Sequence, residues 1–148
     1  MPSVKSREHN FFYSHPKNRF WTIMKSLFLE SISSYKFKEL DTNEKKRDFL
    51  LFKKIALWDV LKSCSINGSD DGSIKNPEIN NLKIIFDIAN IRVVFTTGMK
   101  ATTLYNKYCL NITNMETIYL PSTSPANCRK YKNYEDLLKE YSIILKYL

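Results

Sequence analysis

The stretch Leu120–Asn127 concentrates candidate chemistry in eight residues. It reads Leu-Pro-Ser-Thr-Ser-Pro-Ala-Asn, with three hydroxyls and one amide set beside two prolines. Each proline fixes φ and removes a backbone donor, so the stretch suits neither a helix interior nor a central strand. A rigid loop rich in small hydrogen-bonding groups suits a phosphate backbone or a polar ring. Ser122, Thr123 and Ser124 are therefore candidate binding residues, and a simple Pro/Ser linker is the alternative.

Other common chemical motifs are missing from the sequence. The three cysteines, Cys64, Cys109 and Cys128, are far apart, and His9 and His15 do not complete a zinc spacing. We expect all three thiols to be reduced and metal-free, with Cys64 and Cys109 partly buried. No Walker loop, Gly-x-Gly-x-x-Gly or Gly-x-Ser-x-Gly occurs. Nucleotide hydrolysis by a phosphate-cradling loop and serine-hydrolase chemistry are therefore not expected.

Composition indicates a globular protein with a basic surface. The chain has 148 residues, enough for one domain that buries roughly two thirds of its unfolded surface. Lysine and arginine total 23 against 15 acidic residues, a net charge of +8, which favours a polyanionic partner or serves solubility. No apolar run reaches the ~18 residues that span a membrane, and no secretory leader is seen. We expect a cytoplasmic, intracellular protein with no membrane partner.

The elements that would position the Leu120–Asn127 loop alternate between helices and strands. Helices are expected from Pro16–Asn18, from an Asp41/Glu44 capping box to Lys54, over Glu78–Ala89, over Met99–Cys109 after a turn at Gly98, and over Asn133–Leu148 with Asn133 as cap. Strands are expected at Ile55–Val60, Ile91–Thr96 and Glu116–Leu120, with a long polar loop at Ser63–Asn76. This alternation predicts a parallel α/β domain. The loop after Leu120 then leaves the carboxyl end of a strand, where ligands bind in open sheets.

Three stretches in order carry a family resemblance. They are Pro2-Ser3-Val4-Lys5-Ser6-Arg7, Tyr13-Ser14-His15-Pro16-Lys17-Asn18-Arg19-Phe20-Trp21 and Leu120–Asn127, with Ala56–Val60 and Ser73–Asn76 between them. Together they resemble the hypoxanthine-DNA glycosylase branch of the uracil-DNA glycosylase superfamily. The resemblance implies one uracil-DNA-glycosylase-like domain over residues 1–148, a three-layer αβα α/β fold with a short parallel sheet.

The resemblance also implies an activity. Such an enzyme flips a deaminated base out of double-stranded DNA and hydrolyses its glycosidic bond in base excision repair. It does so without metal or cofactor, with hypoxanthine as the first base and uracil as the second, and is nucleoid-associated when on DNA. The alternative is an inactive remnant or a non-catalytic DNA-binding module of the same family.

The resemblance assigns catalysis to Asn18 and Asp59. An amide such as Asn18 can orient water or bond a base edge without titrating, although it is not a strong general base. The alternative for Asn18 is a helix cap. Asp59 is either the activating carboxylate or a structural acceptor for the loop that follows it.

The remaining candidate residues are expected to contact DNA. Ser122, Thr123 and Ser124 would grip phosphates, Asn127 would brace their loop or reach the base, and Phe20 would stack on the flipped base unless it is core. His15 is either a structural hydrogen-bonder or a contact to base or phosphate. The set is completed by Pro2, Ser3 and Arg129. The basic residues Lys17, Arg19, Arg129, Lys130 and Lys132 are expected to line one DNA-facing surface.

Two departures from the branch bear on the fold. Members have a central strand and a glycine-rich turn before the first motif, whereas this sequence begins at Met1-Pro2; Cys128 replaces a small residue such as alanine. With its first central strand missing, the sheet should leave a slot of about 9–10 Å between strands Ile55–Val60 and Ile91–Thr96. The chain should then be marginally stable or dimeric through the open edge, whereas the full-length family member should be a monomer.

Overall fold

The computed structural model describes residues 11–28, 39–65 and 74–148, except for the side chains of Cys128 and Arg129. Contacts within the chain group it into two compact units. We call the one that contains Trp58–Ser122 the sheet unit, and the one that contains His9–Leu57 and Thr123–Leu148 the helical unit. The stretch Leu120–Asn127 therefore begins in the sheet unit and ends in the helical unit.

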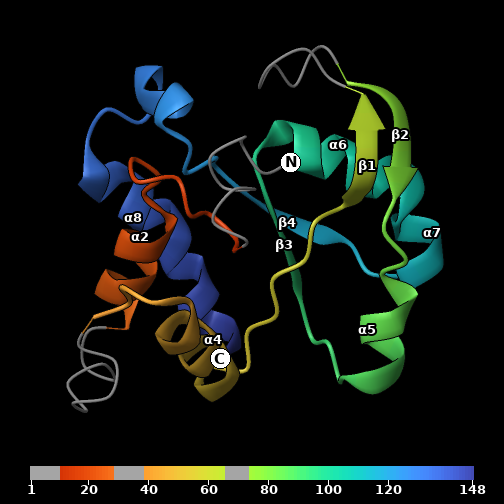
Figure 1. Ribbon diagram of the computed structural model, residues 1–148, viewed down its shortest axis with the longest axis horizontal. Coiled ribbons are helices and arrows are strands. Elements are labelled where there is room, and N and C mark those ends of the chain that lie inside the picture. The colour runs from red at the N-terminus through yellow and green to blue at the C-terminus, as the bar shows by residue number, and fades with distance from the viewer. Residues whose placement is uncertain (1–10, 29–38, 66–73) are drawn as a thin grey trace. The chain divides into compact units, whose positions relative to one another are not determined.

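The sheet unit contains a short parallel pair, β3 (Val94–Thr97) and β4 (Thr117–Leu120), paired from Val94↔Thr117 to Thr97↔Leu120. Parallel neighbours need a long crossover, commonly helical. Here α6 (Met99–Tyr108) and α7 (Leu110–Thr113) supply it, and α6 contacts both β3 and β4 (Figure 1). This arrangement confirms the expected mixed α/β class with a short parallel sheet.

An antiparallel hairpin accompanies the parallel pair. It joins β1 (Leu61–Ser65) to β2 (Lys75–Ile79), with register irregularities on both sides of Ser63. On the surface, Glu78 accepts hydrogen bonds of 2.6 Å from Lys62 Nζ and from Ser63 Oγ. The hairpin leads into α5 (Lys83–Ile88).

The core of the sheet unit forms around the aromatic ring of Tyr105. Leu82, Tyr105 and Cys109 are buried together, and Val60, Ile79, Phe86, Val94, Tyr108 and Leu110 pack against them. Burial raises the pKa of the Cys109 thiol above its ordinary value, which keeps it protonated at neutral pH. Cys64 is partly buried, as expected, whereas Cys109 is more deeply buried than expected.

In its described residues the helical unit contains α2 (Phe20–Leu27), α4 (Asn43–Phe52), η3 (Pro125–Arg129), α8 (Tyr134–Tyr141) and η4 (Ser142–Tyr147). The apolar face of α2 buries Ile23 and Met24, and α8 packs on this helix with Leu137 and Tyr141 buried. The Tyr134 hydroxyl hydrogen-bonds Thr22 O (3.1 Å) and Ser26 Oγ (2.7 Å), which ties the start of α8 to α2. Helices from opposite ends of the sequence therefore share one core.

The expected strand at Ile55–Val60 is wrong. These residues form no strand, and the side chain of Trp58 is 48% exposed. Lys54 adopts φ +53, and Ile55 N donates to Leu50 O at 2.9 Å, which ends α4. The run then crosses from one unit to the other after Leu57, so its apolar residues have no strand partner. Because the slot was expected between this strand and the strand Ile91–Thr96, that expectation falls with the strand.

The expected helix Glu78–Ala89 is shorter, and the expected loop before it is partly a hairpin. Glu78 and Ile79 belong to β2 because they pair with Ser63 and Leu61, a long-range contact that overrides local helical periodicity. The helix begins only at Lys83. The part of the loop at positions 66–73 lies outside the described residues.

Two helix caps also differ from expectation. The helix expected from Asp41 is capped by Thr42, whose Oγ1 accepts from Lys45 N at 3.2 Å, while Asp41 pairs with Lys45 Nζ at 2.8 Å. Asn133 is the N-cap of α8, but its side chain forms no capping hydrogen bond. Apart from boundary shifts, helices α2, α4, α6 and α8 and strands β3 and β4 are confirmed.

Candidate active site

Gly98 and Ser122 meet at the carboxyl end of the β3–β4 pair. Gly98 adopts φ +92 and ψ 149, a conformation open almost only to glycine, and its N–H donates to Leu120 O at 2.8 Å. A Cβ atom on Gly98 would lie 3.3 Å from the Cβ of Ser122. The glycine therefore allows the backbone after β3 to approach the first hydroxyl of the candidate loop closely.

The stretch after β4 is a folded segment and not a linker. Leu120 and Pro121 are buried, and Ser124 caps η3 by accepting from Ala126 N at 3.3 Å. Asn127 N then donates to Ser124 O at 3.0 Å. Ser122 and Ser124 are partly buried, and Asn127 lies within η3.

Asn18 is held in a tight turn just before α2. Its Oδ1 accepts from Phe20 N at 3.0 Å, and its own N–H donates to His15 O at 2.8 Å. His15 Nδ1 accepts from Lys17 N at 3.1 Å, which gives this histidine a structural role in the turn. The Asn18 side chain therefore satisfies the N–H of Phe20, the first residue of α2, whereas the N-cap of this helix is Arg19 and not Asn18.

Arg19 connects this turn to the end of the candidate loop. Its backbone N–H donates to Thr123 O at 3.2 Å, and its Nη1 donates to Tyr131 O at 2.7 Å. Thr123 is only 1% exposed. One residue thus holds both ends of the segment 123–131 against the start of α2, and it does so within the helical unit.

The aromatic residues that follow Arg19 are buried. Phe20 is 4% exposed and Trp21 is 8% exposed. The ring of Tyr13 stacks on Phe20 at a centroid distance of 4.0 Å, and Trp21 Nε1 donates to Phe12 O at 2.9 Å. One face of the Phe20 ring is therefore already covered, which matches the core alternative.

Asp59 is a partly buried carboxylate in the sheet unit. Burial raises the pKa of this carboxyl above its ordinary value. Its backbone carbonyl accepts from Asn80 Nδ2 at 2.7 Å, so the carboxyl itself is not what anchors the backbone here. Among the residues that the structure describes, we find no hydrogen bond or ion pair to the carboxylate.

The remaining predicted residues divide between exposed and undescribed positions. Pro2, Ser3 and the side chain of Arg129 lie outside the described residues. Of the other basic residues proposed for a DNA-facing surface, Lys17, Lys130 and Lys132 are exposed, whereas Arg19 is partly buried. Arg19 therefore departs from expectation, because its side chain binds a backbone carbonyl.

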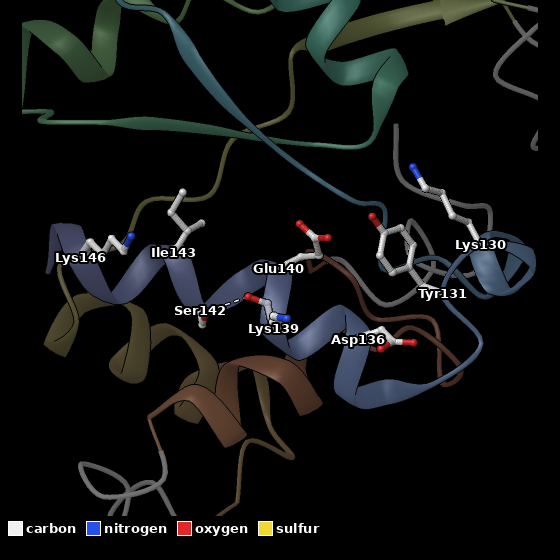
Figure 2. A pocket seen from close by; sticks show the side chains of 8 residues that line it. All are labelled: Lys130, Tyr131, Asp136, Lys139, Glu140, Ser142, Ile143 and Lys146. Carbon is white, nitrogen blue, oxygen red and sulfur yellow. Dashed lines mark hydrogen bonds between the residues drawn. The ribbon is translucent and has the colours of Figure 1, made fainter.

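An open depression of about 610 Å³ lies on the helical unit. Figure 2 shows Lys130 and Tyr131 at one end of it and Lys146 at the other, with Asp136, Lys139 and Glu140 between them. Its lysines are interspersed with acidic residues, so the depression has no single charge character. Tyr131 lines this depression, and its backbone carbonyl accepts the hydrogen bond from Arg19.

Sequence reasoning missed the structural importance of Arg19, Gly98 and Tyr131. Arg19 and Tyr131 are 112 residues apart, and no local pattern predicts their hydrogen bond. Gly98 did carry a signal, since a turn was expected there between a strand and a helix, but its contact with Ser122 required the pairing of β3 with β4. Within the described part of the chain, no three metal-ligating side chains are grouped to hold an ion, and no helix is long and apolar enough to cross a membrane.

Comparison with known proteins gives a consistent result. Residues 1–146 match the model of the uracil DNA glycosylase superfamily. A hypoxanthine DNA glycosylase from Methanosarcina barkeri is 34% identical over 133 residues, covering 88% of this chain and 77% of the relative. A hypoxanthine DNA glycosylase from Methanosarcina acetivorans is 33% identical over 138 residues, covering 91% and 81%. A solution structure from Methanosarcina acetivorans, described as a candidate uracil DNA glycosylase, is 30% identical with a TM-score of 0.76, covering 99% of this chain and 84% of that one.

Proposed function

Because the chain belongs to the uracil DNA glycosylase superfamily, we propose that it excises hypoxanthine, and secondarily uracil, from double-stranded DNA in base excision repair. The two Methanosarcina relatives named hypoxanthine DNA glycosylase support hypoxanthine as the first base. The observation that carries the proposal is the hydrogen bond from Arg19 N to Thr123 O. It joins the residue after Asn18 to the candidate DNA loop, from the opposite end of the sequence.

The reaction is hydrolysis of one C–N bond. Water adds its oxygen to the sugar carbon, the bond to the base breaks with its electrons going to the ring nitrogen, and the base leaves with one proton. The products are the free base and an abasic site. Catalysis requires stabilising an oxocarbenium-like sugar and the departing ring, and positioning the water.

Asn18 is suited to contribute a fixed donor. Its Oδ1 is held by Phe20 N, so the orientation of the whole amide is set by the first turn of α2. Among the described residues we find no hydrogen bond to its Nδ2, which leaves two N–H donors for a water or a base oxygen. A donor held in place before the reaction loses little by reorganising during it.

Asp59 is proposed to activate the water. A carboxylate must be ionised to accept a proton, and burial makes that form more basic by raising the pKa. The dehydrated carboxylate also places negative charge that would favour a cationic sugar. The backbone of Asp59 is held by the hydrogen bond from Asn80, so its carboxylate can take part in the reaction without also having to hold the loop in place.

DNA is proposed to lie along the loop and its flanks. Ser122 and Ser124 offer hydroxyls to phosphates, while Asn127 braces η3 or reaches the base. His15 and Phe20 remain proposed contacts near the base, and Pro2, Ser3 and Arg129 complete the proposed set.

The proposal is tested by incubating the full chain with end-labelled duplexes that carry hypoxanthine, uracil or adenine at one position. Alkali should then cleave the hypoxanthine duplex most, the uracil duplex less and the adenine duplex not at all. EDTA should leave the yield unchanged, because no metal participates.

Two outcomes would decide against the proposal. Retained duplex binding with no alkali-labile product would favour the non-catalytic DNA-binding module. Cleavage that appears before alkali treatment would mean that the chain also cuts the backbone, contrary to a monofunctional glycosylase.

A further inference from the structure

We propose that Arg19 and Thr123 form a receptor for one backbone phosphate of the bound DNA strand, an assignment that rests on the proposed function above. Arg19 carries five N–H donors in a planar fork. Nη1 donates to Tyr131 O at 2.7 Å. Nε and Nη2 are buried, and neither has a hydrogen-bond partner among the residues that the structure describes.

An unpaired guanidinium edge shielded from water is costly. Removing a charge from solvent is unfavourable unless an opposite charge and hydrogen bonds offset the lost hydration. The ion pairs found among the described residues involve Lys45, Lys62 and Lys83, and none of them involves Arg19. The side chain is therefore prepared for an anion that the protein itself does not supply within that region.

The free edge of the guanidinium selects the class of anion. Nε and Nη2 lie on one side of the planar group and can donate two parallel hydrogen bonds to two oxygens of one tetrahedral or planar anion. The Tyr131 carbonyl holds the other nitrogen, so the fork has one fixed orientation. In a chain of net charge +8 whose proposed substrate is DNA, a phosphodiester matches both the charge and the geometry.

Thr123 adds an independent observation. The residue is 1% exposed, and its Oγ1 is buried with no hydrogen-bond partner in the described part of the chain. The residue adjoins Arg19 through the 3.2 Å hydrogen bond from Arg19 N to Thr123 O. We propose that this hydroxyl donates to the same anion as Arg19, whereas a purely structural position would be filled equally well by valine.

The site would also transmit binding to the loop. Arg19 already contacts the backbone at Thr123 and at Tyr131, the two ends of the segment that contains η3. A phosphate on the free edge would fix the guanidinium further, and with it the segment that presents Asn127. Phosphate binding and base recognition would then be coupled through one side chain.

The first experiment needs no catalysis. Melting temperatures of the wild type, Arg19→Gln, Arg19→Lys and Thr123→Val are compared in inorganic phosphate and in chloride at matched ionic strength. Phosphate should raise the melting temperature of the wild type, raise that of Arg19→Lys less, and leave Arg19→Gln unchanged. An equal shift in all four proteins would overturn the receptor.

The second experiment identifies the phosphate. Binding is measured to hypoxanthine duplexes in which single phosphates are replaced by uncharged methylphosphonates. At one position the wild type should lose about 10- to 100-fold in affinity, the scale of a charge-assisted hydrogen bond, and Arg19→Gln should lose nothing further. If no position shows this coupling, Arg19 only holds the segment.

The two proposals fail separately. A chain that shows the coupling but releases no base retains the receptor and loses the glycosylase assignment. A chain that releases hypoxanthine with no coupled position loses the receptor alone. If Arg19→Gln does not fold, the nearly isosteric Thr123→Val carries the same test, with an expected loss at the same phosphate.

Discussion

The stretch Leu120–Asn127 is anchored at two places that are built differently. At the sheet unit, the anchor is a backbone hydrogen bond from Gly98 to Leu120 and the absence of a side chain opposite Ser122. At the helical unit, the anchor is the side chain of Arg19, which binds a carbonyl 112 residues away. The first anchor follows from strand pairing, and the second depends on one long side chain.

The two anchors also differ in how completely their polar groups are satisfied. Gly98 N donates to Leu120 O at 2.8 Å, within the ordinary pattern of the parallel pair. Arg19 and Thr123 have three buried polar atoms that find no partner among the described residues. Groups that break the rule of internal satisfaction are typical of functional sites, whereas satisfied ones carry stability. We therefore expect mutations at the first anchor to affect folding and mutations around the second to affect function.

The largest effect is expected at Asn18, beside the second anchor. Asn18→Ala should lower single-turnover excision at least ~100-fold, the scale of losing one preorganised donor, with duplex binding nearly unchanged. Asn18→Asp keeps an oxygen for Phe20 N and loses the amide donors, so it should fold as well as the wild type and be similarly inactive. A normal rate with a lower melting temperature in the alanine variant would reduce Asn18 to a cap.

Asp59→Asn should lower excision about 100-fold, at the lower end of general-base contributions. In the wild type the rate should rise with pH through the raised pKa of Asp59 and then level off, because only the ionised form accepts a proton. A pH–rate profile of both proteins checks this. A parallel profile in the variant would show that another group titrates.

The same substitution separates function from stability. Between the ordinary pKa of aspartate and the raised value in the folded protein, the folded state binds more protons, so the unfolding free energy falls as pH rises. The Asp59→Asn variant has no carboxyl at this position, so its unfolding free energy does not fall with pH for this reason. It should therefore melt at the same or a higher temperature than the wild type at neutral pH. A markedly lower melting temperature would instead show that Asp59 is a structural acceptor. Its substitution would then affect folding, as we expect for Gly98, and not function alone.

Gly98→Ala tests the first anchor. The substitution places a side chain at φ +92 and brings its Cβ to 3.3 Å from the Cβ of Ser122, so we expect a loss of about 1–3 kcal/mol in unfolding free energy. Urea denaturation measures it. Adding Ser122→Gly should recover the contact part of the loss and leave the backbone part. No loss in the single variant would show that the strand end adapts freely.

The smallest effect is expected at Tyr134, in the helical unit but away from the Arg19 contacts. Tyr134→Phe removes hydrogen bonds to Thr22 O and Ser26 Oγ and should cost about 1 kcal/mol of unfolding free energy without changing excision. Tyr119→Phe is the matched control, because Tyr119 lies on β4 with 39% exposure and no hydroxyl hydrogen bond that we find among the described residues. A change in excision for Tyr134→Phe would mean that the α2–α8 contact reaches the site.

Much of the fold could be predicted from local patterns. The run after Gly98 has helical spacing and begins directly after a short apolar strand, so β3, α6 and β4 were expected close to their observed bounds. The run Ile55–Val60 was misread because periodicity cannot distinguish a buried strand from an apolar crossing between two units. Glu78 and Ile79 joined β2 because pairing with β1 outweighed a helical pattern of similar strength.

By itself, the sequence determined the α/β class, the family, the candidate residues and the place of the loop after a strand, because composition, spacing and ordered motifs are local properties of a chain. Only the tertiary structure decided what those residues contact. It covered one face of Phe20 with Tyr13, bonded the Asn18 oxygen to Phe20 N, and buried Thr123. Most of all, it placed the guanidinium of Arg19 against the carbonyl of Tyr131. Contacts over such separations form only when the helices from both ends of the sequence share one core, and no residue pattern encodes them locally.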